Sequence, residues 1–191
     1  MKHPTLFVVL ATGLVAMTIA PAFAQLPATV TSPDQNVLVR ITQDDGGQLR
    51  YTIQRGGEIV FAPSALRVRL AEGDISSVDV RQVNPRSIKQ VHKLTATKAA
   101  EAIDQFNELT VNAAPRSRAV RAVQWIFRAY DDGVAFRYVV PADAGLKTLS
   151  VRSEDTEFTF NDAYACHGFN VGRVDSSHEG EFDPVLASRI R

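Results

Sequence analysis

The densest group of side chains that could do chemistry lies between Asp175 and Asp183. This stretch holds four carboxylates and one imidazole, namely Asp175, His178, Glu179, Glu181 and Asp183. Hard cations such as calcium bind about six to eight oxygen ligands, often carboxylates and carbonyls from separate loops. One loop alone would be an incomplete cage, and it lacks the Asp-x-Asp-x-Asp-Gly regularity of an EF-hand. The residues therefore leave two interpretations open, a solvated acidic loop and one part of a calcium site.

Other catalytic patterns are weaker. Cys166 and His167 are adjacent, and neighbouring residues on a strand point to opposite faces, which argues against a thiol nucleophile with its base. Cys166 is also the single cysteine, so the chain cannot form an internal disulfide. The histidines at 92, 167 and 178 stand too far apart in sequence to suggest a zinc site. No Gly-x-Ser-x-Gly elbow and no phosphate-binding loop is present.

The amino-terminal segment predicts export. Lys2 and His3 precede an apolar run over residues 6–19, which is followed by the small-x-small pattern Ala22-Phe23-Ala24. This is typical of a cleaved signal peptide over residues 1–24. We therefore expect a mature chain of residues 25–191 that is periplasmic or secreted and has no membrane contact after cleavage.

The charge of the chain argues against a nucleic-acid partner. Lysine and arginine number 21 and aspartate and glutamate number 21, which gives a formal net charge of zero. Such a balance provides no basic patch for nucleic acid or for an anionic lipid surface.

Hydrophobic residues alternate with a period of two over most of the chain, which predicts strands. Alternation and turn residues predict a meander over 37–61, with reversals at 44–47 and 55–58 and with Pro63 closing the third strand. Further strands are expected at 65–70, 76–83, 105–113, 120–130, 134–140, 146–153 and 156–160. Only residues 98–103 look helical, and they are few and uncapped. The pattern predicts one all-β domain, an antiparallel sandwich.

The most informative strand pair is a hairpin over residues 127–138. Two alternating runs flank Asp132-Gly133, a dipeptide that suits a type I′ turn because both central residues of that turn need positive φ. Asp131 and Asp132 are therefore better explained as turn residues than as a catalytic pair. The aromatic residues in and beside this hairpin could form a sugar-stacking platform, but packing between the two sheets of the sandwich is the favoured role. These residues are Trp125, Phe127, Tyr130, Phe136 and Tyr138.

This hairpin closely resembles the N-terminal domain of glycoside hydrolase family 97. The resemblance extends over most of the mature chain. It includes Ser32-Pro33-Asp34 before a strand, the hairpin at 44–51, the run Phe106-Asn107-Glu108-Leu109-Thr110-Val111, and the strand entry at 153–158.

The resemblance implies a fold and a role. Enzymes of this family are exported bacterial α-glucosidases or α-galactosidases with an N-terminal β-super-sandwich of the galactose-mutarotase type, a (β/α)₈ barrel and a small C-terminal β-domain. The barrel carries the catalytic acid and the base or nucleophile. Calcium at the active site is held mainly by barrel glutamates, with one glutamate from the N-terminal domain. That ligand corresponds to Glu179 here, with Glu181 as the fallback.

The printed sequence stops before any barrel. We therefore expect a super-sandwich that is incomplete at its C-terminal end, and an accessory domain that is inactive by itself. Its oligosaccharide substrate and its Ca²⁺ would be bound only in a complete enzyme. Glu108 and Asn107 are expected to be cross-strand partners or rim contacts. Two alternatives stay open, a stand-alone carbohydrate-binding module and a sandwich with a purely structural role.

Overall fold

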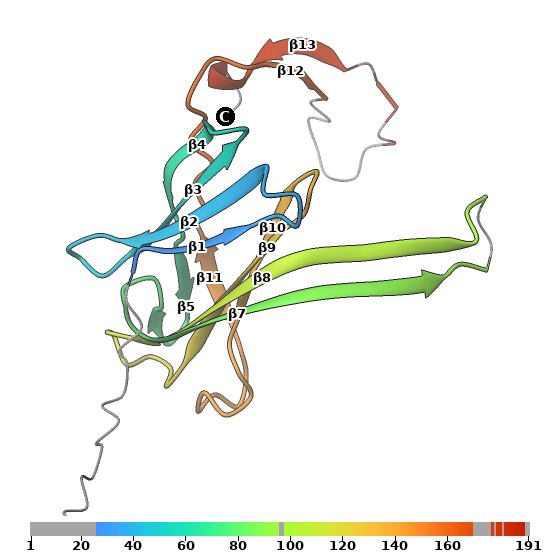
Figure 1. The fold of residues 1–191 in the computed structure, drawn as a ribbon. Helices are drawn as coiled ribbons and strands as arrows, with labels where there is room; N and C mark the ends of the chain where they lie inside the picture. Colours follow the sequence, from blue (N-terminus) through green and yellow to red (C-terminus); the bar gives the residue numbers. More distant parts are fainter. Residues whose placement is uncertain (1–25, 96–97, 170–176, 178, 181, 190–191) are drawn as a thin grey trace, which may run out of the picture.

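The fold consists almost entirely of antiparallel β-structure (Figure 1). The computed structural model describes residues 26–95, 98–169, 177, 179, 180 and 182–189. Within these residues, the helical structure is a single 3₁₀ turn, η1 (Ala187–Arg189), and no helix has the length and apolar character to cross a membrane. The all-β prediction is therefore confirmed. The predicted signal peptide at 1–24 lies outside the described residues.

The first sheet is the predicted meander. Its strands follow in chain order: β1 (Ala28–Thr31), β2 (Val37–Gln43), β3 (Leu49–Arg55) and β4 (Glu58–Ala65). The β3–β4 reversal uses Gly56 and Gly57, whose φ angles of 60° and 85° are the positive values that a type I′ turn requires. Pro63 does not close the strand as predicted. It lies within β4 where the register shifts, and a β-bulge tolerates a residue that has no N–H.

The second sheet has the order β10-β9-β8-β7. Its strands are β7 (Val78–Lys93), β8 (Glu101–Pro115), β9 (Val123–Ala129) and β10 (Val134–Val139). β7 and β8 pair along their full length and project beyond the other strands as a ribbon (Figure 1). The helical look of residues 98–103 is misleading, because β8 already begins at Glu101. Pairing with β7 outweighs the local preference there.

Two small sheets complete the fold. One has the order β11-β5-β6, with β5 (Val68–Leu70), β6 (Gly73–Asp74) and β11 (Val151–Glu154), and the other joins β12 (Ala165–Gly168) to β13 (Asp183–Leu186). The predicted strand at 65–70 is thus split, and the one at 146–153 is reduced to β11. The one at 156–160 keeps backbone hydrogen bonds to β4, but forms only an isolated bridge between Phe160 and Phe61.

One hydrophobic core takes side chains from both four-stranded sheets. The first sheet contributes Val39, Ile41, Leu49 and Tyr51, and the second contributes Leu109, Val111, Trp125 and Phe127. The alternation of β9 explains this, because Val123, Trp125, Phe127 and Ala129 share one face of the strand. The indole N–H of Trp125 is buried without a hydrogen-bond partner among the described residues, and the ring meets Tyr138 edge to face at 6.3 Å. The super-sandwich closure implied by the resemblance stays a prediction.

The diagnostic hairpin forms between β9 and β10, but its turn differs from the expectation. Tyr130 and Gly133 close the loop, since the Tyr130 N–H donates to the Gly133 carbonyl at 2.8 Å, so the loop residues are Asp131 and Asp132. Neither of them has a positive φ, and the turn is therefore not type I′. A tertiary contact fixes this geometry, because the Asp34 N–H donates to Asp131 Oδ1 at 2.9 Å.

Candidate functional site

The predicted metal ligand Glu179 lies in the connection between β12 and β13. Its side chain is exposed and makes no hydrogen bond or ion pair with other described residues. The residues beside it hold the loop: the rings of Phe169 and Phe182 pack at 5.3 Å. A Cβ placed on Gly180 would run into the Phe169 ring, so glycine allows the chain to pass close to it.

A free carboxylate at a loop suits a hard cation, but it would be only one ligand. Among the described residues, no three His, Cys, Asp or Glu side chains are grouped closely enough to hold a metal ion. Glu181, the fallback ligand, lies outside the described residues. The donor chemistry of Glu179 therefore fits a calcium ion whose remaining oxygen ligands come from elsewhere.

Cys166 and His167 do not form a catalytic pair. They occupy successive positions of β12, where Cys166 is half-buried and His167 is exposed. The thiol lies 3.7 Å from the carbonyl of Tyr164, an ordinary local contact. The expectation that adjacent residues face opposite ways is confirmed.

The strongest electrostatic feature is a buried carboxylate between two arginines. Glu108 in β8 is only 1% exposed, and its oxygens accept hydrogen bonds from Nε of Arg86 at 2.6 Å and from Nε of Arg128 at 2.8 Å. The register explains the arrangement, because Glu108 lies directly opposite Arg86 in β7 and Arg128 in β9. The Arg128 guanidinium also stacks over the Phe106 ring, 4.3 Å from its centre. The expected cross-strand role of Glu108 is confirmed.

The two arginines keep this carboxylate ionised. Burial by itself would raise the pKa of Glu108, but the hydrogen bonds from Arg86 and Arg128 and their positive charges together lower it. The same contacts raise the pKa values of both guanidinium groups, which stay charged. A carboxylate with a lowered pKa and both oxygens bonded stays ionised near neutral pH, so this cluster is structural rather than a general acid.

A second anchored carboxylate fixes the segment that follows β11. Glu157 Oε2 accepts a hydrogen bond from the Ala65 N–H at 2.9 Å, and its other oxygen pairs with Arg67. The Tyr51 hydroxyl donates to the Glu157 carbonyl at 2.6 Å. Burial is the main reason that the pKa of Tyr51 rises to about 12. Residues 155–161 are thereby held along the free side of β4.

This anchored segment carries aromatic rings from the core to the surface. Phe158 packs on the core ring Phe136 at 6.1 Å and on Phe61 at 6.0 Å, and Phe160 lies 4.8 Å from Phe61 and 5.8 Å from Tyr164. Phe158, Phe160 and Tyr164 are 55%, 41% and 38% exposed. We call these three residues the aromatic strip.

The aromatic residues singled out in the sequence mostly pack inside. Trp125 and Phe127 are completely buried, and Phe136 and Tyr138 pack against the same core. The preference for core packing over a sugar platform is therefore confirmed for them. Sequence reasoning missed the aromatic strip and the arginine partners of Glu108. A carboxylate directly before Leu109 in a predicted strand was the available signal for the second.

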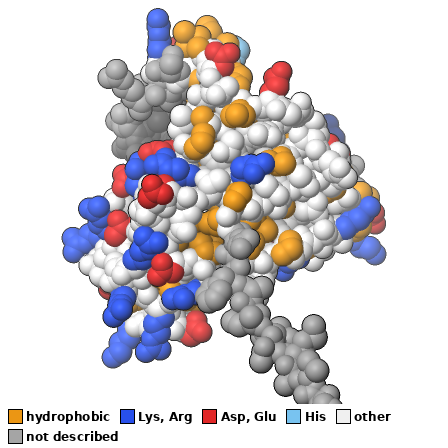
Figure 2. Space-filling model, turned by 60° about the vertical axis from the view of Figure 1, so that its left-hand side comes forward, with side chains coloured by type: hydrophobic (Ala, Val, Ile, Leu, Met, Phe, Trp, Pro, Cys, Tyr) orange, Lys and Arg blue, Asp and Glu red, His pale blue; other side chains and the backbone are white. Residues whose placement is uncertain are grey.

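The surface charge agrees with the balanced composition. On the face shown in Figure 2, basic and acidic side chains are intermingled and hydrophobic side chains form small scattered groups.

Comparisons with known proteins show which family this chain resembles. The family model described as Glycosyl-hydrolase 97 N-terminal matches residues 30–191. A retaining alpha-galactosidase from Bacteroides thetaiotaomicron is 26% identical over 162 residues, which cover 84% of this chain and 22% of that protein.

Solved structures agree. A glycoside hydrolase family 97 enzyme in complex with acarbose, from Pseudoalteromonas sp. strain K8, matches with a TM-score of 0.64 and 31% identity over 71% of this chain and 20% of its own. A beta-arabinopyranosidase matches with a TM-score of 0.63 and 25% identity over 70% of this chain and 21% of its own. The chain thus spans about one fifth of the length of these relatives.

Fold and comparisons together define an antiparallel β-domain of the kind found in glycosidases. The chain belongs to the glycoside hydrolase family 97 N-terminal family.

Proposed function

We propose that this chain is the accessory N-terminal domain of an exported, calcium-dependent α-glycosidase. In this role it helps to shape the cleft for an oligosaccharide, contributes Glu179 as one calcium ligand, and has no hydrolytic activity alone. The observation that carries the proposal is the family match over residues 30–191 in a chain that spans about one fifth of the length of its glycosidase relatives. Glycoside hydrolysis needs two positioned carboxyl groups at the scissile bond. In the described part of the chain, the well-anchored Glu108 and Glu157 are both tied up in ion pairs.

Glu179 has the properties that a contributed ligand requires. Its carboxylate is exposed and is not engaged by any described residue, while the ring pair Phe169–Phe182 and Gly180 constrain the chain around it. A calcium ion bound near a sugar would stabilise charge that develops as the glycosidic bond breaks. What this chain supplies is the position of one carboxylate at the edge of the cleft.

A chimera tests this role. Residues 30–191 replace the matching 162-residue segment of the Bacteroides thetaiotaomicron alpha-galactosidase, and calcium affinity is measured by calorimetry together with hydrolysis of nitrophenyl α-galactoside. We expect Glu179→Gln to weaken calcium binding and turnover together by about tenfold or more. Glu101→Gln, which neutralises another exposed carboxylate, should leave both unchanged.

Two results would contradict the proposal. Unchanged calcium affinity in the Glu179→Gln chimera would show that this residue is not the ligand. Hydrolysis of nitrophenyl glucoside or galactoside by the purified chain alone would show that it is not an accessory domain.

The aromatic strip supports a second candidate, a stand-alone carbohydrate-binding module. Phe158, Phe160 and Tyr164 present exposed rings on an anchored segment, and binding sites commonly combine aromatic rings with a few polar groups. Calorimetric titration of the purified chain with maltose, panose and melibiose tests it. Heat of binding that Phe160→Ala abolishes would favour this function, and absence of both heat and thermal stabilisation would eliminate it.

A further inference from the structure

Beyond Val78, whose N–H donates to the Gly47 carbonyl, the outer edge of β7 is the longest unpaired strand edge among the described residues. β7 is the last strand of its sheet and pairs with β8 on one side only. Its 16 residues extend over roughly 50 Å at about 3.3 Å per residue. Such an edge presents a row of backbone N–H and C=O groups that can pair with another strand.

The outer part of this edge belongs to a thin ribbon. β9 pairs with β8 only from Asn107 to Ala113. Residues 88–93 of β7 and their partners 101–106 of β8 therefore form a ribbon that is only two strands wide. Val91 and Ile103 face each other across the ribbon and are both exposed. Two-stranded ribbons are marginally stable in water, and a third strand would add hydrogen bonds and cross-strand contacts.

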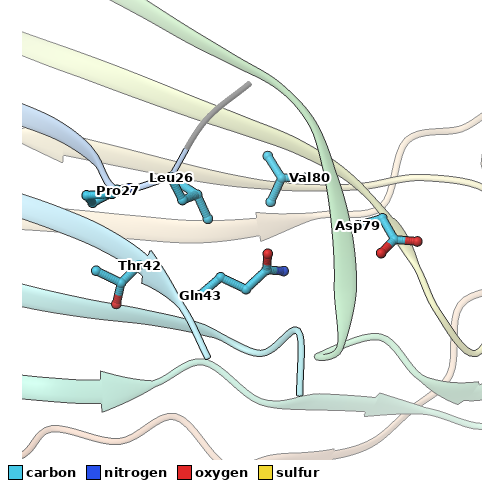
Figure 3. Close-up of a pocket in the computed structure, with 6 residues that line it drawn as sticks. All are labelled: Leu26, Pro27, Thr42, Gln43, Asp79 and Val80. Atoms are coloured by element: carbon cyan, nitrogen blue, oxygen red, sulfur yellow. The ribbon is translucent and has the colours of Figure 1, made fainter. Parts of the chain in front are cut away.

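Two hollows lie where the first sheet comes close to β7, and the second of them also takes in residues of β8. The first, of about 520 Å³, is lined by Leu26, Pro27, Thr42, Gln43, Asp79 and Val80. Figure 3 shows Leu26 and Val80 above Thr42 and Gln43 in this hollow. The second, of about 380 Å³, is lined by residues 29–31 of β1, residues 85–87 of β7, and Asn107 and Glu108. Strand addition uses main-chain hydrogen bonds for affinity and side-chain pockets for specificity, and hollows beside β7 leave room for the side chains of an added strand.

The charges along β7 indicate the chemistry of the partner. The strand carries Arg81, Arg86, Lys89 and Lys93 against a single acid, Asp79. Asp79 is already paired with Arg116 at 3.0 Å, and the one carboxylate of Glu108 is shared by Arg86 and Arg128. In the described part of the chain, Arg81 and Lys89 have no ion-pair partner. The edge therefore carries a surplus of positive charge.

This surplus argues against a second copy as the occupant. Two β7 edges pairing with each other would bring positively charged side chains together, and like charges across strands are destabilising. Pro85 also interrupts the donors of the edge, as is common where self-pairing is avoided.

We propose that the outer edge of β7 is a docking edge for an extended, acidic polypeptide segment. The segment adds a fifth strand to the sheet, and its carboxylates meet Arg81 on one face of β7 and Lys89 on the other. This inference goes beyond the accessory role and does not depend on Glu179.

Two labelled ten-residue peptides test the proposal, one alternating valine with glutamate and the other alternating valine with lysine. Binding to the purified protein is measured by fluorescence anisotropy, and amide hydrogen exchange is followed over residues 80–93. We expect the glutamate peptide to bind at least about tenfold more tightly than the lysine peptide and to protect the β7 amides. The double variant Arg81→Glu/Lys89→Glu should reverse the preference.

A matched control separates the edge from net charge. Lys147→Glu/Arg152→Glu makes the same change in formal charge at two exposed residues outside β7 and should keep the preference for glutamate. Equal binding of the two peptides, reversal by the control variant, or unprotected β7 amides would overturn the proposal. A dimer in sedimentation with protected β7 amides would identify a second copy as the occupant and would also overturn it.

Discussion

Replacing Glu108 by glutamine should destabilise the protein far more than the loss of a surface charge would. Glutamine keeps the shape of the side chain but has only one acceptor oxygen for two donors. In the native protein both carboxylate oxygens are used, at 2.6 Å to Arg86 and 2.8 Å to Arg128, and the side chain is only 1% exposed. The variant therefore turns an N–H group of the new amide toward one of the guanidinium groups.

The size of the effect follows from burial and exposure together. A hydrogen bond to a charged group contributes about 1.5–3 kcal/mol, and removing one partner of a fully buried ion pair costs about 3–5 kcal/mol. Here the arginine side chains are 57% and 30% exposed, so water can solvate part of the charge that is left behind. We expect a loss of about 2–3 kcal/mol in the free energy of unfolding.

Urea unfolding followed by tryptophan fluorescence measures this loss. Trp125 is the only tryptophan of the chain, is fully buried, and lies in the same strand as Arg128, so its emission reports on this sheet. Glu101→Gln is the matched control, since it removes an exposed carboxylate from the same strand β8. It should change the free energy of unfolding by less than about 0.5 kcal/mol.

One result would refute the reasoning. If Glu108→Gln lowered the free energy of unfolding by no more than Glu101→Gln does, the two hydrogen bonds would contribute little. The cluster would then resemble an exposed ion pair, for which values of about 0–1 kcal/mol are usual.

Three further predictions concern the same sheets. Hydrogen bonds and charges lower the pKa values of Glu108 and Glu157 from 4.5, so the stability that these two carboxylates contribute is complete above that pH and is lost as the pH falls through the lowered values. The urea concentration at the unfolding midpoint, measured between about pH 3 and 7, should therefore decrease at the acid end, and it should decrease less steeply in Glu108→Gln. Glu157→Gln should cost about 1–2 kcal/mol and speed amide exchange at Ala65, because the Ala65 N–H loses a carboxylate acceptor. Gly57→Ala should lower the free energy of unfolding by about 1 kcal/mol, because the added Cβ would clash with no neighbour but alanine disfavours the φ of 85° found at this position. An unchanged melting temperature would show that the turn can relax.

The sequence predicted the fold class well because alternation and turn residues are local signals. The meander of β2, β3 and β4, its Gly56-Gly57 reversal and the β9–β10 hairpin all appear where the pattern places them. Boundaries failed where pairing with another part of the chain decides them. β8 begins inside a stretch with a helical look because 15 residue pairs join it to β7. The hairpin turn centres on Asp131 and Asp132 because Asp34, 97 positions away, binds one of them.

The candidate site was likewise predictable from the sequence only in part. The residues by themselves marked only an acidic cluster over 175–183, and the family resemblance singled out Glu179, whose carboxylate the described structure leaves exposed. They could not show that Glu108 lies between Arg86 and Arg128, since the register of three successive strands sets that contact and the sequence does not specify that register.

Alternation along a strand thus determined which face each side chain takes, because it follows from backbone geometry alone. Tertiary structure decided which faces are covered, which carboxylates are paired and which edge is left open, because these depend on how the sheets come together. That is why Phe127 and Phe158 differ: the first is sealed within the core, and the second emerges at the surface.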